Sequence, residues 1–419
     1  MGDVLDELQW RGLVAQTTDE PALRQALAEG PITVYCGFDP TAPSLHFGNL
    51  VQLVVLRHLQ RAGHRVICLV GGSTGLIGDP RPTSERVLKT KEQTAHNVAR
   101  ISSLVRPFLR FDGDDPAILV DNLDWTAPMS AIDFLRDIGK HFRVNQMIRK
   151  DAVATRLASE QGISYTEFSY QLLQGLDYLE LYRAHGCTLQ TGGSDQWGNI
   201  TAGVDLIHRA EGAGVHALAT PLLEDSSGTK FGKSEGNAVW LSADMTSPYA
   251  FYQYFLNVED ASAVRLLRVF TDRSQAQVDD LARSLEEQPF LRAAQKALAA
   301  DITTLVHGAD ATASVQAASE ALFGTGDVAA LDAATLVDAT GELPGADVPV
   351  GTSVVDALVA VGLVPSRNAA RRTIGEGGAS VNNVRVSDPD QLLMASDFLH
   401  GRVALLRRGR KNLAAARLG

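Results

Sequence analysis

The sequence contains little that would place the protein in an oxidising compartment or a membrane. Only three of its 419 residues are cysteines, at Cys36, Cys68 and Cys187, which excludes a disulfide framework and a paired Cys-x-x-Cys metal motif. No uncharged apolar run approaches the ~18 residues of a membrane span, and the first residues are acidic, unlike the start of a leader. We therefore expect a cytoplasmic protein that does not enter a membrane.

The sequence also lacks an overall positive charge. Its 38 basic and 49 acidic residues give a net charge of −11, which excludes a protein that coats nucleic acid with its whole surface. The charge is uneven, however, because residues 351–419 contain ten Lys and Arg against five Asp and Glu, a net of +5. A local basic surface is therefore expected at the C-terminal end.

The hydrophobic pattern predicts an α/β protein of several domains. With 45% hydrophobic residues, a chain of 419 residues exceeds the usual size of one compact domain and can fill more than one core. In the first half, short β-branched runs alternate with longer helical stretches, which is typical of a parallel sheet with crossover helices. We expect strands over the ranges 32–38, 64–70, 117–122 and 187–190.

Composition indicates where the domains end. Residues 247–323 have a helical pattern, whereas residues 324–350 contain five acidic residues, four glycines and no Lys or Arg. The second stretch is typical of a solvated linker. We expect a sheet domain over 1–246, an α-helical domain over 247–323, an acidic flexible linker over 324–350 and a small module over 351–419.

A polar segment follows the first expected strand, at the start of an apolar helix. His46 and Asn49 are three residues apart, so both point to one side of a helical turn, and Gly48 has no side chain to block a ligand. The N–H groups of a helix N-terminus suit a phosphate. A histidine at a helix start is more often structural, so this segment alone does not decide between the two interpretations.

A glycine-rich segment follows the second expected strand. Residues 72–78 have the spacing GxxGxxG, whereas the dinucleotide-binding motif is GxGxxG after a first strand. The alternative is a tight strand-to-helix turn. The functional group of this segment would then be Asp79, a carboxylate that could hold a substrate ammonium.

A second glycine-rich segment, residues 228–234, resembles a Walker A loop in composition but not in the spacing of its glycines. Three residues separate its two glycines where the P-loop needs four, which disfavours a P-loop kinase. The loop would still present Lys230, Lys233 and Ser234 to phosphates. A solvated hairpin tip is the alternative interpretation.

A polar stripe is expected on a helix over residues 166–183. Tyr170, Gln174 and Asp177 stand at positions i, i+4 and i+7, so they share one face. The ordinary interpretation is an amphipathic helix with this face in water, but the stripe contains no Lys or Arg, so a partly enclosed polar pocket is the alternative.

A dense polar turn is expected over residues 191–199. Two glycines allow a ligand to approach the backbone closely, while Asp195 and Gln196 offer a carboxylate and an amide. Such a turn is rarely a mere connection.

Together these segments resemble the signature motifs of the class I aminoacyl-tRNA synthetases, and among them the tyrosyl enzymes of the bacterial type. Residues 46–49 (HFGN) resemble the family's His-x-Gly-His element, with an asparagine in place of the second histidine. Residues 230–234 (KFGKS) resemble its mobile Lys-Met-Ser-Lys-Ser loop. Segments that match the tyrosyl enzymes more specifically are 35–41 (YCGFDPT), 122–125 (NLDW) and 192–199 (GGSDQWGN), together with the polar stripe. The resemblance covers essentially the whole chain.

The resemblance implies a Rossmann-like catalytic domain, an α-helical domain on the anticodon side and a small α+β RNA-binding module of ribosomal-protein type. It implies that the enzyme activates tyrosine with ATP to tyrosyl-adenylate and pyrophosphate, and then transfers the tyrosyl group to the 3′ end of tRNA(Tyr). Magnesium would accompany ATP, bound mainly through its phosphates, and the sequence shows no zinc-type ligand spacing. A homodimer is expected from the family.

The resemblance also assigns roles to individual residues. Catalytic roles fall to Thr41, His46, Lys230, Lys233 and Ser234. Tyrosine binding falls to Tyr35, Asp79, Asn122, Tyr170, Gln174, Asp177 and Gln196. ATP binding falls to Cys36, Gly37, Asp39, His46, Gly48, Asn49, Gly192, Gly193, Asp195 and Lys233. RNA binding by the C-terminal module falls to Arg367, Arg371, Arg372, Arg407, Arg408, Arg410 and Lys411.

Within these sets the resemblance implies that Tyr35 and Asp177 bind the phenolic hydroxyl, and that Asp79 holds the ammonium. A tryptophanyl enzyme has the same fold but needs no polar pair for a phenol, which disfavours that alternative. A regulatory RNA-binding module without catalysis would lack phosphate donors, whereas His46, Lys230 and Lys233 are present.

Overall fold

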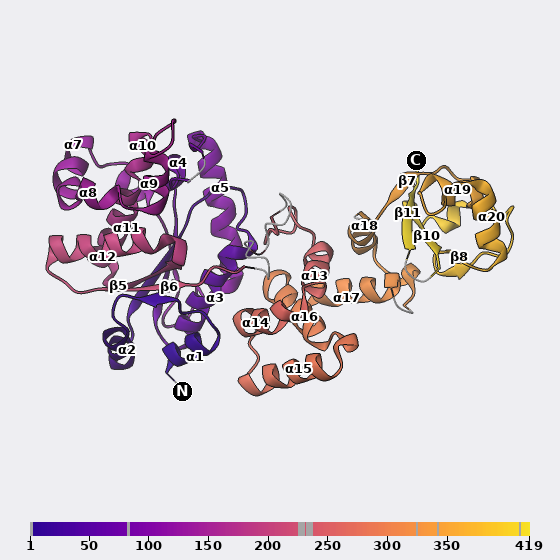
Figure 1. Ribbon diagram of the computed structural model, residues 1–419, viewed down its shortest axis with the longest axis horizontal. Helices are drawn as coiled ribbons and strands as arrows, with labels where there is room; N and C mark the ends of the chain where they lie inside the picture. The colour runs from indigo at the N-terminus through magenta and orange to yellow at the C-terminus, as the bar shows by residue number, and fades with distance from the viewer. Residues whose placement is uncertain are drawn as a thin grey trace. The chain divides into compact units, whose positions relative to one another are not determined.

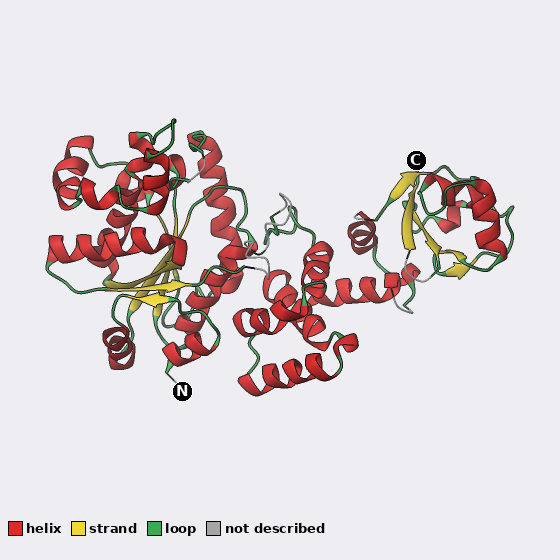
Figure 2. Cartoon of the chain, in the orientation of Figure 1, coloured by secondary structure: helices red, strands yellow, loops and turns green. Residues whose placement is uncertain are grey.

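The computed structural model describes residues 3–81, 84–224, 231, 238–323, 326–341, 343–409 and 412–419. The chain forms two compact units, drawn as ribbons in Figure 1 and coloured by secondary structure in Figure 2. The first unit consists of Met1–Met245 with Glu259–Ala294, and the second of Thr246–Val258 with Gln295–Gly419. None of the described helices is long and apolar enough to cross a membrane.

The first unit is built on a six-stranded sheet with the order β1-β6-β5-β2-β3-β4. Its strands are β1 (Gln16–Thr17), β2 (Thr33–Phe38), β3 (Arg65–Val70), β4 (Ile118–Asp121), β5 (Cys187–Gly193) and β6 (His216–Thr220). Strands β2 to β6 are parallel, and β1 is antiparallel to β6. The four expected strands are therefore present, and β1 and β6 are additional.

The helices of the first unit connect these strands and extend beyond them. The α-helices are α1 (Val4–Trp10), α2 (Glu20–Glu29), α3 (Phe47–Arg61), α4 (Thr74–Ile77), α5 (Lys91–Leu104), α6 (Leu123–Thr126), α7 (Ala131–Asp133), α8 (Val144–Met147), α9 (Asp151–Leu157), α10 (Tyr165–Phe168), α11 (Tyr170–His185), α12 (Trp197–Glu211), α14 (Asp260–Phe270) and α15 (Gln275–Glu287). Shorter turns are η1 (Arg106–Phe108), η2 (Phe134–Ile138), η3 (Gly139–His141), η4 (Ser194–Gln196) and η6 (Pro289–Leu291).

Strand β5 runs further than the sequence predicts. Residues 191–193 were expected in a turn because of their two glycines, but they pair with β6, with Gly192 opposite Ala219. A side chain at Gly192 would lie 2.8 Å from Cδ1 of Ile200 on α12. The glycine is therefore needed for close packing of the helix on the strand, which composition alone does not reveal.

Adjacent residues of β2 face the helices on the two sides of the sheet. Tyr35 packs in one buried cluster with Leu176 and Leu179 of α11, whereas the thiol of Cys36 lies 3.8 Å from Oε1 of Gln52 on α3. This alternation follows from the two-residue period of a strand.

The order of the strands fixes where a ligand can bind. From β2 the chain moves to β3 and β4 on one side, and β5 then adds on the other side of β2. Connections that leave in opposite directions open a crevice beyond the carboxyl ends of these two strands. The segments after β2 and β5 are those that carry the sequence motifs.

The first unit includes helices beyond the expected border at residue 247. The guanidinium of Arg11 donates hydrogen bonds to the backbone oxygens of Arg268 and Thr271, at 2.7 and 2.6 Å. Helices α14 and α15 belong to this unit. Composition misses the association because it depends on contacts between residues more than 250 positions apart.

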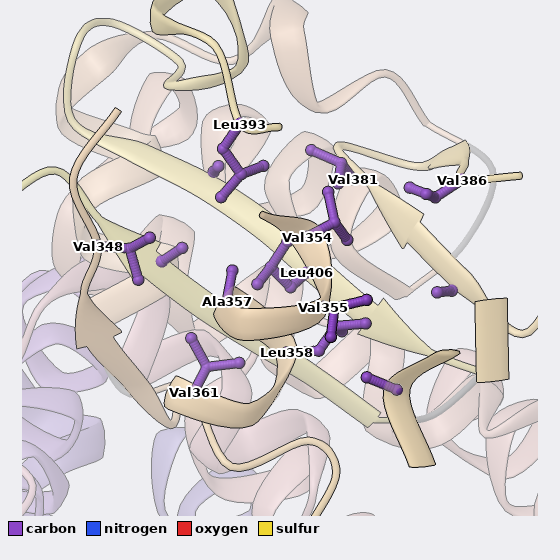
Figure 3. Packing of buried hydrophobic residues seen from close by; sticks show 14 of the residues in the cluster. Val348, Val354, Val355, Ala357, Leu358, Val361, Val381, Val386, Leu393 and Leu406 are labelled. Carbon is purple, nitrogen blue, oxygen red and sulfur yellow. The ribbon is translucent and has the colours of Figure 1, made fainter. Parts of the chain in front are cut away.

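The second unit combines helices with a five-stranded sheet of order β7-β11-β10-β8-β9. Its elements are α13 (Pro248–Leu256), α16 (Ala293–His307), α17 (Ala309–Phe323), η7 (Val328–Ala330), α18 (Ala333–Gly341), β7 (Gly345–Asp347), α19 (Val354–Ala360), α20 (Arg367–Gly375), β8 (Ala379–Val381), β9 (Val384–Arg385), η8 (Ala395–Asp397), β10 (Val403–Arg408) and β11 (Asn412–Arg417). Figure 3 shows the core of the C-terminal module, in which Val354 and Leu358 of α19 pack with Leu406 of β10.

The stretch expected to be a flexible linker, 324–350, carries regular structure. It contains α18, which packs on α13 and α17, and β7, which pairs in parallel with β11. A side chain at Gly345 would collide with the backbone oxygen of Ala415, so this glycine permits strand pairing. The acidic residues and glycines of 324–350 therefore do not mark a flexible linker. They accompany the exposed face of α18 and the close contact between β7 and β11.

Candidate active site

A cavity of about 340 Å³ lies at the carboxyl ends of β2 and β5. Its wall joins residues from β2 and the segment after it, the start of α3, the turn after β3, helix α11 and the end of β5. Expected site residues in this wall are Tyr35, Cys36, Gly37, Asp39, Thr41, His46, Gly48, Asn49, Asp79, Tyr170, Gln174, Asp177, Gly192, Gly193, Asp195 and Gln196.

Three expected catalytic residues, Lys230, Lys233 and Ser234, lie outside the described residues. Phe231, between the two lysines, is described and lines the cavity. Its ring centroid lies 5.9 Å from that of Phe47, the first residue of α3.

One part of the cavity wall pairs a buried phenol with a buried carboxyl group. The side-chain oxygens of Asp177 accept hydrogen bonds from Nδ2 of Asn122 at 2.9 Å and from Nε1 of Trp125 at 3.0 Å. Burial raises the pKa of Asp177 to about 7, although these two hydrogen bonds act in the opposite direction. The Tyr35 hydroxyl is buried and has no hydrogen-bond partner among the described residues.

Burial raises the pKa of Tyr35 well above its ordinary value, and the nearby charge of Asp177 adds to this effect. The phenol is therefore neutral and remains a donor and an acceptor. A buried hydroxyl without a partner is costly, so this wall is complementary to a ligand that carries its own polar group.

Asn122 supports this wall from behind. It is fully buried and is not among the residues that line the cavity, although the sequence assigned it to tyrosine binding. Besides Asp177, its Nδ2 atom donates to Oγ1 of Thr74 at 3.1 Å, and its Oδ1 atom accepts from the backbone N–H of Ser73 at 2.7 Å. The structure thus gives Asn122 a role in holding Asp177 and the turn after β3.

A second carboxylate, Asp79, faces the cavity from the turn after β3. Its Oδ2 atom accepts a 2.9 Å hydrogen bond from Nε2 of Gln196, and its Oδ1 atom accepts a 3.2 Å bond from Nδ2 of Asn199. Gln174 lines the same cavity, and its Oε1 atom is buried without a partner among the described residues. A carboxylate and an unused amide oxygen in one cavity suit an ammonium group, which has only donors.

Tyr170 links the polar stripe of α11 to the segment after β2. Its hydroxyl donates a 2.7 Å hydrogen bond to Oδ2 of Asp39, whose Oδ1 atom accepts from Oγ1 of Thr74 at 2.7 Å. Burial raises the pKa of Asp39, and these two bonds partly offset the rise. The sequence expected Tyr170 at the ammonium and Asp39 at ATP, and in this structure the two residues bind one another.

The segment 46–49 begins α3 with reciprocal contacts between His46 and Asn49. Oδ1 of Asn49 accepts a 3.2 Å hydrogen bond from the backbone N–H of His46, so Asn49 caps the start of α3. A side chain at Gly48 would lie 2.9 Å from Cε1 of His46. The absence of a side chain at Gly48 therefore leaves room for the imidazole of His46, and both residues line the cavity.

The glycine-rich segment after β3 is a strand-to-helix turn, as the alternative interpretation expected. The backbone N–H of Gly72 donates a 3.0 Å hydrogen bond to Oδ1 of Asp121 at the end of β4. A side chain at Gly72 would collide with that carboxylate. Helix α4 follows the turn at once, and the segment carries Asp79 to the cavity.

Several cavity residues were missed by sequence reasoning. Gln52 donates from Nε2 to Oγ1 of Thr220 at 2.7 Å and accepts from Oγ1 of Thr191 at 2.8 Å. A lone amide inside the apolar run LVQLVVL was a signal that could have been noticed. Arg86 also lines the cavity, with its Nε atom 2.8 Å from the backbone oxygen of Asp79, and nothing in its local sequence indicates this.

The expected RNA-binding arginines of the second unit make contacts within that unit. Arg367 pairs with Asp356, and Arg371 lies 3.3 Å from a side-chain oxygen of Asp390. Arg407 donates to the backbone oxygen of Leu322 at 2.6 Å, and Arg408 to that of Leu363 at 3.0 Å. Arg372 lies exposed on α20, whereas Arg410 and Lys411 lie outside the described residues.

Comparisons with known proteins agree with this geometry. The family model "tRNA synthetases class I (W and Y)" matches residues 27–324. The tyrosine–tRNA ligase of Streptomyces coelicolor is 60% identical over 419 residues, which are 100% of this chain and 99% of the relative. The chain belongs to the tyrosine–tRNA ligase family of class I aminoacyl-tRNA synthetases. The same family in Leifsonia xyli has a member 59% identical over 98% of this chain and 93% of the relative.

The family model "Tyrosine--tRNA ligase SYY-like C-terminal domain" matches residues 336–415. Among solved structures, a C-terminally truncated mitochondrial tyrosyl-tRNA synthetase of Coccidioides posadasii has a TM-score of 0.67 and 31% identity, covering 75% of this chain and 91% of that one. A tryptophanyl-tRNA synthetase of Encephalitozoon cuniculi, at 14% identity and a TM-score of 0.53, covers 74% of this chain and 87% of that one, and shares the fold only. The expected α/β fold of a class I synthetase is confirmed.

Proposed function

We propose that the cavity of the first unit binds tyrosine beside ATP and joins them as tyrosyl-adenylate, and that the tyrosyl group then passes to the 3′ end of tRNA(Tyr). This is the reaction for which the curated relatives are named. The observation that carries the proposal is the buried Tyr35 hydroxyl without a partner, in the same wall as Asp177.

The phenolic hydroxyl of tyrosine would complete this pair. It would donate to the carboxylate of Asp177 and accept from the hydroxyl of Tyr35. Phenylalanine would fill the same space but leave both groups without a partner, at a cost of about 1–3 kcal/mol for each buried polar group. The two residues therefore determine specificity for tyrosine.

The ammonium of tyrosine would lie against Asp79, with the free amide oxygen of Gln174 beside it and Gln196 near the carboxylate. Tyr170 would form part of the wall around the ammonium while its hydroxyl remains hydrogen-bonded to Asp39. The support for this arrangement is that all five side chains reach one cavity wall. The tyrosine carboxylate would then point toward the nucleotide.

Adenylate formation needs no side-chain nucleophile, because the tyrosine carboxylate itself attacks the α-phosphorus of ATP. The contributions of the protein would be positioning and stabilisation of charge. Cys36, Asp195 and the backbone of Gly192 and Gly193 would meet the ribose. Thr41 and His46 would meet the phosphates, joined by Lys230, Lys233 and Ser234 of the loop.

Magnesium would reach the site with ATP and neutralise charge on the phosphates. The part of the chain that the structure describes has no group of three or more His, Cys, Asp or Glu arranged to hold a metal ion. The carboxylate of Asp39 in the cavity is engaged by Thr74 and Tyr170. Magnesium that accompanies a nucleotide is usually held by substrate phosphates and water, and we propose the same here.

The second unit would bind the tRNA, with the helices on the anticodon side and the C-terminal module on the RNA backbone. The net charge of +5 over residues 351–419, against −16 for the rest of the chain, supports RNA binding by this module. These are the roles predicted for the catalytic domain, the helical domain and the module, although α14 and α15 belong to the first unit. The three buried, unpaired cysteines fit a cytoplasmic location.

A homodimer would use the region of α7 to α10, which Figure 1 shows together in the first unit. Ile132, Val144 and Tyr165 there are 69%, 62% and 68% exposed. Leu135, Val144 and Tyr165 also line an apolar cavity of about 360 Å³. Large exposed apolar residues in one region favour a protein interface, and a symmetric dimer would cover two such surfaces at once.

The proposed function is tested by ATP–pyrophosphate exchange measured with each of the twenty amino acids in turn. We expect exchange with tyrosine alone. A signal with tryptophan would assign the pocket to the other branch of the family model, and no signal with any amino acid would make the chain a binding module.

A further inference from the structure

A lysine lies directly behind the wall that carries Asp79. Lys150 stands immediately before α9, and its ammonium donates a hydrogen bond to Oδ1 of Asn199 on α12. The residue before Asn199 is Gly198, where a side chain would lie 3.0 Å from Cε of Lys150. The absence of a side chain at this position lets the lysine reach the amide.

Asn199 also forms hydrogen bonds with two residues that line the cavity. Its Nδ2 atom donates to Oδ1 of Asp79 at 3.2 Å and to Oε1 of Gln196 at 2.9 Å. Gln196 in turn donates from Nε2 to Oδ2 of Asp79 at 2.9 Å. Lys150, Asn199, Gln196 and Asp79 thus form one connected chain of hydrogen bonds that ends at a carboxylate in the cavity.

The direction of this chain is set at the lysine. An ammonium has three donors and no acceptor, so Asn199 must turn its oxygen toward Lys150 and its nitrogen toward Asp79. The Nδ2 atom of Asn199 donates to the side-chain oxygen of Gln196. The side-chain nitrogen of Gln196 is then directed at Asp79. Reversal of the Asn199 amide would place an oxygen against a carboxylate oxygen, which is repulsive.

We propose that Lys150 is a positioning residue for the amino acid substrate: by orienting the amides of Asn199 and Gln196, it holds the Asp79 carboxylate in the geometry that receives the substrate ammonium. The inference rests on the proposed placement of that ammonium at Asp79. Lys150 itself does not line the substrate cavity, so it acts through Asn199.

The protonation of Lys150 gives this role a pH dependence. Burial lowers the pKa of Lys150 to about 8, and the charge of Asp79 opposes the shift. Other charged or titratable side chains around the space that Lys150 borders are His141, Arg143, Arg149, Asp195, Asp205 and Arg209. A neutral amine can accept as well as donate, so the orientation of Asn199 is no longer dictated above this pH. Tyrosine affinity should therefore fall as the pH rises through about 8.

The first test compares Lys150→Met with Arg149→Met in the full-length protein. Both variants remove one positive charge from the border of the same space, but no hydrogen bond joins Arg149 to the described residues of the network. In pyrophosphate exchange we expect K150M to raise the KM for tyrosine about 5- to 20-fold, with kcat and the KM for ATP within about threefold of wild type. R149M should leave all three constants near wild type, and equal effects of the two variants would overturn the proposal.

The second test asks whether Lys150 acts through Asn199. In a double-mutant cycle, Asn199→Leu should raise the KM for tyrosine, and adding K150M to N199L should change it by less than about twofold. Additive effects would mean that the lysine acts elsewhere. The rise of KM above pH 8 should also be absent from K150M, and an unchanged pH profile in that variant would contradict the proposal. The wild-type profile and N199L remain informative even if K150M folds poorly.

The variant Asp79→Asn distinguishes the proposed ammonium site at Asp79 from the proposed positioning role of Lys150. If D79N raises the KM for tyrosine and K150M does not, the positioning role fails while the ammonium site stands. If D79N leaves the KM unchanged, the proposed ammonium site itself is wrong.

Discussion

The indole nitrogen of Trp125 and the carboxylate of Asp177 are joined by a 3.0 Å hydrogen bond in the first unit. Trp125 lies on the short helix after β4, whereas Asp177 lies in the middle of α11. The indole is a donor only, so it favours the ionised form of the carboxyl group, which is the form that accepts a hydrogen bond from a phenol.

Replacement of Trp125 by Phe should therefore weaken tyrosine binding. The ring is kept, but one oxygen of Asp177 loses its donor and the pKa of the carboxyl group rises further. We expect the dissociation constant for tyrosine to increase about 5- to 30-fold, as befits the loss of a hydrogen bond to a charged group. Equilibrium dialysis with labelled tyrosine measures this. Unchanged affinity would show that the indole does not tune Asp177.

Tyrosine binding should weaken as the pH falls below about 7. Burial raises the pKa of Asp177 from an ordinary value of 3.8 to about 7, so the carboxyl group takes up a proton in this range and ceases to be a full acceptor. The raised pKa also means that protonated Asp177 stabilises the folded state relative to the unfolded chain. This contribution to the free energy of unfolding is fully present below about pH 4 and is lost as the pH rises to about 7. Dissociation constants measured between pH 5.5 and 8 test the binding effect. Asp177→Asn is the control, since it cannot titrate, and a pH profile that persists in it would point to another group.

The sequence predicts many, but not all, of the residues that face the cavity. Polar side chains at the ends of parallel strands meet at one edge of a sheet, and the polar stripe of α11 has a helical spacing. Asp79, Gln174, Asp177 and Gln196 were expected at the site on these grounds, whereas Tyr35 was expected only from the family resemblance, and all five line one cavity.

The supporting residues could not be predicted in the same way. Gln52 contacts Thr220 and Lys150 contacts Asn199, and each of these partners lies more than 40 positions away in the sequence. Arg86 differs, because its contact is with the nearby Asp79. No local spacing marks such contacts. The acidic stretch 324–350 shows the converse error, since its composition is typical of a linker while its pairing with β11 is determined by a distant strand.

Asn49→Ala should reduce stability more than it reduces nucleotide binding. The side chain of Asn49 caps α3 through the backbone N–H of His46. Loss of this hydrogen bond, which Asn49 makes from the third helical position, costs about 0.5–1.5 kcal/mol. Urea unfolding monitored by fluorescence should show this loss, with Asn49→Ser recovering part of it. A normal free energy of unfolding together with a strongly raised KM for ATP would instead assign Asn49 to the nucleotide.

Glu167→Gln should be strongly destabilising. Glu167 and Arg156 form an ion pair of 2.9 Å in which both side chains are 2% exposed, and the other oxygen of Glu167 accepts from the backbone N–H of Arg86. Removal of one charge leaves the other buried without its partner, at a cost of about 3–5 kcal/mol. The double variant R156M/E167M removes both charges and should recover much of the stability. Thermal unfolding of the three proteins tests this, and a double variant less stable than E167Q would contradict it.

Removal of residues 345–419 should separate the two half-reactions. This cut takes away the whole C-terminal sheet and the core shown in Figure 3, and it leaves α18 packed on α13 and α17. Tyrosine-dependent pyrophosphate exchange should stay within about twofold of wild type because the cavity lies in the first unit. Charging of tRNA should fall by at least about tenfold if the basic module supplies phosphate contacts, as proposed above.

A cut at residue 351 is the matched comparison. It removes most of the module but leaves β7 without its partner β11 and exposes Val348, which is buried in the module core. This shorter deletion should therefore aggregate more readily than the longer one, even though it retains more of the chain. Size-exclusion chromatography of the two proteins measures the difference. If both deletions lose pyrophosphate exchange to the same extent as tRNA charging, the module serves to stabilise the first unit rather than to bind tRNA.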